Sequence, residues 1–97
     1  MTADRMQRIE QRIRAALPVS HIDIEDESHL HAGHAGARDG RGHFNLLVVS
    51  EAFAGKSPLQ RHRLVNEAVG DMFETDIHAL SIRAQTDAER AERAQDA

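Results

Sequence analysis

Four histidines stand out as the residues that could do chemistry. His29, His31 and His34 lie close together in a glycine-rich segment, and His78 opens the later apolar run IHALSI at 77–82. Imidazole is the commonest ligand of transition metals and titrates closest to neutral pH, so this pattern points to metal binding, proton transfer or phosphate contact. The chain has no cysteine, so any sulfur ligand of a metal centre here must come from another molecule.

The available donors narrow the metal chemistry. Structural zinc sites favour several cysteines, which this chain lacks. A catalytic zinc needs three protein ligands, which His29, His31 and His34 could supply in number. However, the sequence has no His-Glu-x-x-His motif, and a glycine-rich loop would hold three ligands loosely. We therefore predict that the protein is not an enzyme.

A second group of candidates is basic. Lys56, Arg61, His62 and Arg63 surround the predicted start of a helix at Pro58. Backbone N–H groups at a helix start, together with basic side chains, are typical phosphate contacts, which makes this region a DNA-binding candidate. The net charge of −4 and the scarcity of aromatic residues for base stacking argue against it. The alternative is that Arg61 and Arg63 pair with surface acids and that His62 caps or packs.

Length and composition set the frame for both groups. A chain of 97 residues is enough for one domain with one modest core, so we expect a single domain over 1–97. No apolar run approaches the roughly 20 residues of a membrane span, and the N-terminus lacks the layout of a secretory signal. The simplest expectation is a cytoplasmic protein that neither enters a membrane nor acts on a small-molecule substrate.

Periodicity predicts the elements of the first half. Apolar residues at steps of three and four predict a helix that ends before Pro18, with a buried stripe of Met6, Ile9, Ile13 and Leu17. Alternation over 21–27 predicts a strand with one wet face, and 43–50 predicts a second strand in a central position. The glycine-rich segment 28–42 between them predicts a long loop, where function is expected.

The second half begins with a helical turn at 50–53. Ser57, Pro58 and Gln60 form a capping-box pattern that starts a helix running to about Glu74. A third strand follows over 77–84, with His78 and Leu80 on the same face. Thr86 to Glu89 resembles another capping box, but little apolar surface follows it, so a frayed helix or tail is expected over 87–97.

This order predicts an α+β fold. Strands one and two should form an antiparallel pair across the long loop, whereas strands two and three, joined through a helix, should be parallel. The result is a two-layer sandwich with a three-stranded mixed sheet in the order α-β-β-α-α-β-α.

Several strings, in this order, resemble the BolA family over nearly the whole chain. They are Asp26-Glu27-Ser28 before the histidine loop, Gly42-His43-Phe44, Val49-Ser50-x-x-Phe53, Gly55, Leu59-Gln60-Arg61-His62-Arg63-Leu64-Val65 and His78-Ala79-Leu80. The resemblance implies a class II KH-like fold, which agrees with the predicted element order. The chain departs from the pattern at Arg90, where family members often carry an aromatic residue.

The resemblance also implies a function. BolA-like proteins partner monothiol glutaredoxins and share a bridged two-iron two-sulfur cluster with them and with glutathione, and some bacterial members are DNA-binding transcriptional regulators. By position, His78 matches the family's histidine ligand and His31 the ligand in the variable loop, with His34 and then His43 as alternatives. The expectation is an adaptor for iron-sulfur cluster transfer or iron sensing that holds no cofactor alone. The alternative is a DNA-binding regulator that uses the helix starting at Pro58.

Overall fold

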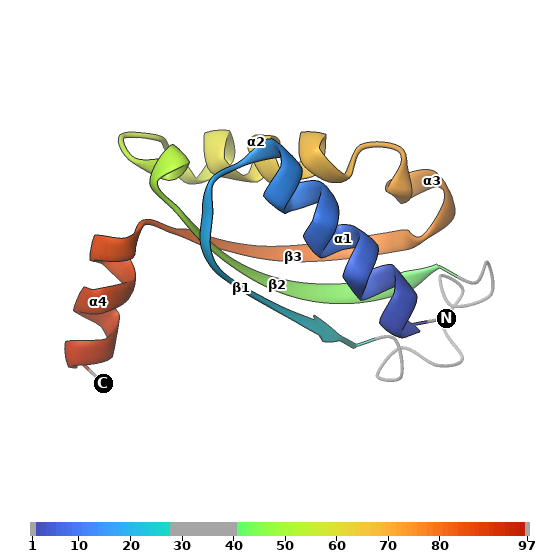
Figure 1. Ribbon diagram of the computed structural model, residues 1–97, viewed down its shortest axis with the longest axis horizontal. Helices are drawn as coiled ribbons and strands as arrows, with labels where there is room; N and C mark the ends of the chain where they lie inside the picture. Colours follow the sequence, from blue (N-terminus) through green and yellow to red (C-terminus); the bar gives the residue numbers. More distant parts are fainter. Residues whose placement is uncertain (1, 28–40, 97) are drawn as a thin grey trace.

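The structure, a computed structural model, describes residues 2–27 and 41–96. Its elements are α1 (Thr2–Ala16), β1 (Val19–Asp26), β2 (Gly42–Ser50), the short 3-10 helix η3 (Glu51–Phe53), α2 (Pro58–Val69), α3 (Met72–Thr75), β3 (Ile77–Gln85) and α4 (Asp87–Asp96). The sheet has the order β1-β2-β3, with β1 antiparallel and β3 parallel to β2. α1 and α2 cover one face of it (Figure 1). The predicted α+β class, mixed sheet and central second strand are confirmed.

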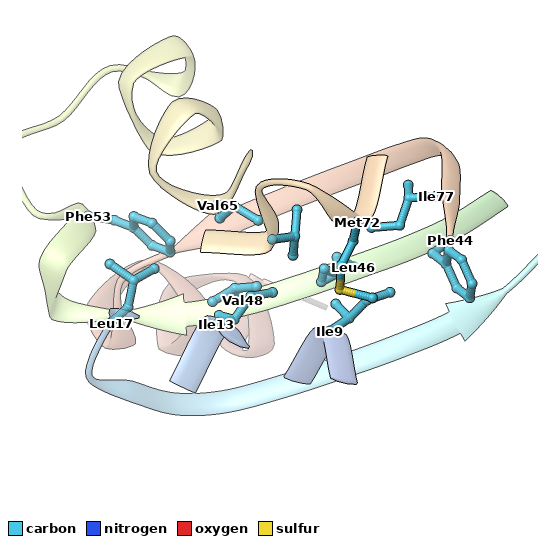
Figure 2. Packing of buried hydrophobic residues seen from close by; sticks show 11 residues of the cluster. Ile9, Ile13, Leu17, Phe44, Leu46, Val48, Phe53, Val65, Met72 and Ile77 are labelled. Atoms are coloured by element: carbon cyan, nitrogen blue, oxygen red, sulfur yellow. The ribbon is translucent and has the colours of Figure 1, made fainter. Parts of the chain in front are cut away.

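The core lies between these helices and the inner face of the sheet (Figure 2). Ile9 and Ile13 of α1 have no exposed surface, which confirms the apolar stripe read from the sequence. On β2, Phe44, Leu46 and Val48 alternate toward the same core. On β1 the acidic side chains of the alternating pattern are exposed, as expected for a strand with one wet face.

The prediction of one continuous helix from Ser57 to about Glu74 is wrong after Val69. The capping box at Ser57 and Gln60 is present, but α2 ends at Val69 and a separate short helix, α3, follows. Gly70 takes a φ of 44°, a conformation that L side chains rarely adopt. This break lets Met72 point into the core while α3 changes direction before β3.

The C-terminal helix is tied to the domain at its first turn. The predicted capping box is present, with the Thr86 N–H donating to Glu89 at 2.8 Å and the Glu89 N–H to Thr86 Oγ1 at 3.2 Å. Ser20 of β1 donates to Asp87 at 2.9 Å. The expectation of a frayed helix or tail over 87–97 took no account of the bond from Ser20, because that residue is distant in the sequence. No helix in the described part of the chain is long and apolar enough to cross a membrane.

Candidate functional site

His78 lies at an irregularity in the sheet. Gly42 of β2 pairs with Ile77, but the next residue, His43, pairs with Ala79, so His78 is an extra residue on β3. Such a bulge interrupts the alternation of side chains and redirects the residue it contains. The predicted face assignment is therefore wrong at the start of the strand. Ile77 is fully buried in the core and His78 is exposed, instead of sharing the face of Leu80.

The bulge brings His78 next to His43. The two ring centroids are 5.1 Å apart, with the planes tilted by 44°. Two imidazoles on one tetrahedral metal ion, with bonds of about 2.1 Å, would place their centroids about 5 Å apart. This spacing is compatible with a shared metal ion. Of the four candidate metal ligands, His43 and His78 are the two that lie within the described residues. Within residues 2–27 and 41–96 no group of three or more His, Asp or Glu side chains is placed to hold a metal.

Arg41 contacts the same histidine. Its guanidinium donates to the carbonyl of Phe73 at 2.7 Å and lies 3.4 Å from Nδ1 of His78. An arginine can only donate, so Nδ1 is the acceptor of this contact. A metal at Nδ1 would displace Arg41, and a metal at Nε2 of neutral imidazole would require the proton on Nδ1. Metal binding and the Arg41 contact are therefore mutually exclusive.

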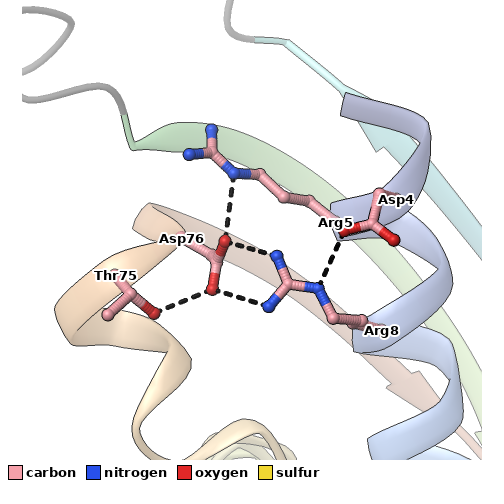
Figure 3. Close-up of polar contacts among 5 residues, drawn as sticks. All are labelled: Asp4, Arg5, Arg8, Thr75 and Asp76. Carbon is pink, nitrogen blue, oxygen red and sulfur yellow. Dashed lines mark hydrogen bonds and ion pairs between the residues drawn. The ribbon is translucent and has the colours of Figure 1, made fainter. Parts of the chain in front are cut away.

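A buried carboxylate fixes the strand just before His78 (Figure 3). Arg8 donates to both oxygens of Asp76 at 2.6 and 3.1 Å, and Nε of Arg5 donates at 3.1 Å. The hydroxyl of Thr75 adds a bond of 2.8 Å. The Asp76 side chain is only 8% exposed, and its backbone carbonyl accepts from Gly42 at 3.0 Å. We call Asp76, Arg5, Arg8 and Thr75 the Asp76 cluster; it ties α1 to the beginning of β3.

The cluster also sets the charge state of its acid. Hydrogen bonds from Arg8, and then those from Thr75 and Arg5, lower the pKa of Asp76 from 3.8 to about 2 against the opposing effect of burial. The arginines of α1 gave no signal of this role, because their spacing is that of a solvated helix face. Their partner lies about 70 residues away in the sequence.

The four basic candidates for DNA binding differ in their exposure and in their contacts. Arg61 is 13% exposed and donates to both carboxylate oxygens of Glu89, at 2.7 and 3.0 Å. It also donates to the carbonyls of Lys56 and Ala84. The alternative account, in which Arg61 pairs with an acid, is what the structure contains. Lys56 and Arg63 are exposed and His62 is half-buried.

The remaining candidates, His29, His31 and His34, lie outside the described residues. The described ends of the loop that carries them are nevertheless informative. The N–H of Glu27 donates to the carbonyl of His43 at 2.8 Å, so the loop leaves β1 directly beside His43. His43 and His78 therefore lie near the point where the loop departs.

Comparison with known proteins identifies the family to which this fold belongs. The family model for BolA-like protein matches residues 13–89. SufE-like protein 1 of Arabidopsis thaliana is 45% identical over 87 residues, which is 84% of this chain and 24% of that protein. The solved BolA domain of SufE1 from the same plant superposes with a TM-score of 0.75 and 42% identity, covering 86% of this chain and 92% of that one. The chain belongs to the BolA-like family.

A bacterial relative carries a functional name. The DNA-binding transcriptional regulator BolA of Escherichia coli is 34% identical over 80 residues, or 82% of this chain and 73% of that protein. Several other relatives are longer than this chain, which spans 56% of the chloroplastic protein BOLA1 of Arabidopsis thaliana and 61% of mouse BolA-like protein 1. Because some relatives are named for chloroplasts or mitochondria, the cytoplasm stays a prediction.

Proposed function

We propose that this protein is a non-enzymatic adaptor that binds a monothiol glutaredoxin and shares a bridged two-iron two-sulfur cluster with it. The observation that carries the proposal is the His43 and His78 pair, with ring centroids 5.1 Å apart at a bulge beside the histidine loop. A chain without cysteine can contribute no thiolate, so glutaredoxin and glutathione would supply the thiolates. Mixed histidine and thiolate ligation of such clusters is chemically sound and raises their reduction potential.

His78 is the proposed first ligand, and the proposed second ligand is His31, with His34 or His43 as alternatives. The spacing to His78 supports His43, whereas the match of the loop to the family supports His31. The shared cluster would serve in cluster transfer to other proteins or in iron sensing. The Asp76 cluster and the bulge would hold His78 in place, and Arg41 would have to release it first.

The test mixes the protein with a monothiol glutaredoxin, glutathione, iron and sulfide, and records visible absorption and circular dichroism. We expect a spectrum distinct from that of the glutaredoxin homodimer, abolished by His78→Ala. Comparison of His31→Ala, His34→Ala and His43→Ala then identifies the second ligand, with His62→Ala as the matched control on α2. An unchanged glutaredoxin spectrum on addition of this protein would refute the proposal.

Acid offers a second check, because protonated imidazole cannot bind iron. We expect the shared cluster to be lost as the pH falls below the range in which histidine is neutral. A complex that stayed intact at about pH 5 would contradict histidine ligation.

The second candidate function is DNA binding through the start of α2. It is favoured by the name of the bacterial relative and by the exposed side chains of Lys56 and Arg63 beside a capped helix N-terminus. Binding driven by phosphate contacts should weaken steeply with salt, whereas a metal-bridged protein pair should weaken little. We would measure duplex binding by fluorescence anisotropy in Lys56→Ala/Arg63→Ala, with Arg14→Ala on α1 as control. Equal affinity in both variants would exclude this region.

A further inference from the structure

β1 is an edge strand, paired on one side with β2 and flanked by no other strand of the described chain. The backbone bond from Glu27 to His43 fixes which of its residues face the partner. In an antiparallel pair such residues alternate, so the N–H and C=O groups of Asp23 and Glu25 point toward β2. The same groups of Ile22 and Ile24 therefore point outward along the edge.

Two hollows flank this edge, one on each side of the sheet. The first, of about 590 Å³, lies between α1 and β1 and includes the half-buried apolar side chains of Met6, Ile22 and Ile24. The second, of about 430 Å³, lies on the opposite face and extends from β1 across β2 to Arg83 of β3, with Leu47 as its main apolar contribution. Ile24 and its neighbour Asp23 line both hollows. A strand laid along β1 would have the first hollow on its helix side, and Asp23 and Glu25, at the rim of the second hollow, on its other side.

The side chains that line the two hollows are mostly acidic, which favours a basic partner. Asp4, Glu10 and Asp23 line the first and no cation does, while Asp23 and Glu25 line the second against one cation, Arg83. Three of these acids have partners on their own element: Asp4 with Arg8 at 3.2 Å, Glu10 with Arg14 at 2.8 Å and Asp23 with His21 at 2.8 Å. Such exposed pairs contribute little, so they can exchange for the cations of an incoming chain.

We propose that the edge of β1 binds an extended segment of another polypeptide in which basic residues alternate with apolar ones. The segment adds as a fourth strand, with backbone bonds to Ile22 and Ile24. Its alternate side chains point toward the first hollow and toward Asp23 and Glu25 on the other face, because successive residues of a strand point to opposite faces. A second copy of this chain is a poorer occupant, since its own β1 would bring Asp23 and Glu25 against their counterparts.

The test uses amide hydrogen exchange measured by NMR on the full chain. In the free protein, the amides of Ile22 and Ile24 should exchange faster than those of Asp23 and Glu25. An eight-residue synthetic peptide that alternates lysine and valine should slow the exchange of Ile22 and Ile24 by about tenfold or more. A peptide that alternates glutamate and valine should leave their exchange unchanged. Lysine–valine peptide with N-methyl groups on its pairing edge should also fail, because it cannot form the backbone bonds.

Charge reversal completes the test without touching the core. Asp23→Lys/Glu25→Lys should abolish protection by the lysine peptide and create it with the glutamate peptide, whereas Glu67→Lys on the exposed side of α2 should change neither. Protection of Ile22 and Ile24 in the free protein that grows with protein concentration would assign the edge to a second copy and overturn the proposal. Equal binding of the N-methylated peptide, or shifts confined to other elements, would overturn it too.

Discussion

Two arginine–carboxylate contacts at opposite ends of β3 are alike in chemistry and opposite in burial. At the start of the strand, Arg8 donates hydrogen bonds from both terminal nitrogens to the carboxylate of Asp76. Near the end of the strand, Arg61 binds the carboxylate of Glu89 in the same way. The pKa of each acid is lowered to about 2, chiefly by hydrogen bonds from its arginine. However, Asp76 is the buried partner in the first pair, with 8% exposure, while Arg61 is the buried partner in the second, with 13%.

The difference shows where each contact has its effect. The buried Asp76 collects four hydrogen bonds in the middle of a junction between α1, α3 and β3, two residues before His78. Glu89, with 44% of its side chain exposed, mainly helps to fasten α4 to a buried arginine. The same kind of contact, an arginine bound to a carboxylate, therefore positions the candidate ligand His78 at one end of β3 and the peripheral helix α4 at the other. The contact with Glu89 also engages the Arg61 guanidinium in bonds within the domain.

The largest expected effect comes from removal of the buried acid. Asp76→Ala deletes the acceptor for Arg5, Arg8 and Thr75, and hydrogen bonds to charged groups are each worth about 1.5–3 kcal/mol. Because the arginines can turn to solvent, we expect a net loss of about 2–4 kcal/mol in the free energy of unfolding in urea. Asp71→Ala, which removes the exposed partner of Arg12, is the control and should cost much less. Equal losses would show that burial does not separate the two contacts.

Acid should reproduce part of this loss. The folded pKa of Asp76 lies below its ordinary value of 3.8, so the contact stabilises the protein fully above that value and loses this contribution as the pH falls through about 2. Glu89 acts in the same direction, which makes a difference measurement necessary. Urea midpoints between about pH 5 and 2 should fall more steeply for the unmodified protein than for Asp76→Asn. Parallel slopes would mean that the Asp76 pKa is not depressed.

Arg61→Ala, which removes the buried partner of the second contact, should lower the free energy of unfolding by less than Asp76→Ala does. The side chain donates to two carbonyls and to Glu89, and its guanidinium carbon lies 6.0 Å from the centroid of the buried Phe53 ring. We expect a loss of about 1–2 kcal/mol in urea unfolding, through packing as well as charge. Arg63→Ala, its exposed neighbour on α2, should be almost neutral. If the two variants matched, Arg61 would not be a structural residue.

Glu89→Gln should have the smallest effect. The amide oxygen of glutamine keeps one acceptor for Arg61, but its –NH2 group cannot accept the second bond. Solvent screens the lost charge at this half-exposed position, so global stability should fall by less than in Arg61→Ala, while amides in the first turn of α4 should exchange faster. The amides around Asp76 should not respond. A response there would couple the two ends of β3 and remove the contrast between them.

Local sequence signals were reliable where the interactions that create the structure are local. The capping box of α2 joins Ser57 to Gln60, three residues apart, and the sequence alone located it. The alternation of β1 and the apolar stripe of α1 were equally direct, because burial on one face requires them. Prediction failed at Gly70, where the apolar stripe continues past the residue whose backbone conformation ends the helix.

The candidate site was predictable in its residue types but not in its assembly. His78 and His43 were both identified, the second as the last alternative, and nothing in the sequence placed them side by side. The bulge that does so depends on how β3 pairs with a strand more than thirty residues earlier. Arg41 and the Asp76 cluster were missed for the same reason, since each joins residues far apart in the chain.

By itself, then, the sequence determined the elements, the family and the donor chemistry: imidazoles without thiols, on a small α+β scaffold. These follow from periodicity, capping residues and composition, each of which acts over a few residues. The tertiary structure alone decided which arginine is buried, which acid is clamped and which histidines meet. Those outcomes depend on strand register and on contacts between α1 and β3, which exist only once the chain has closed around its core.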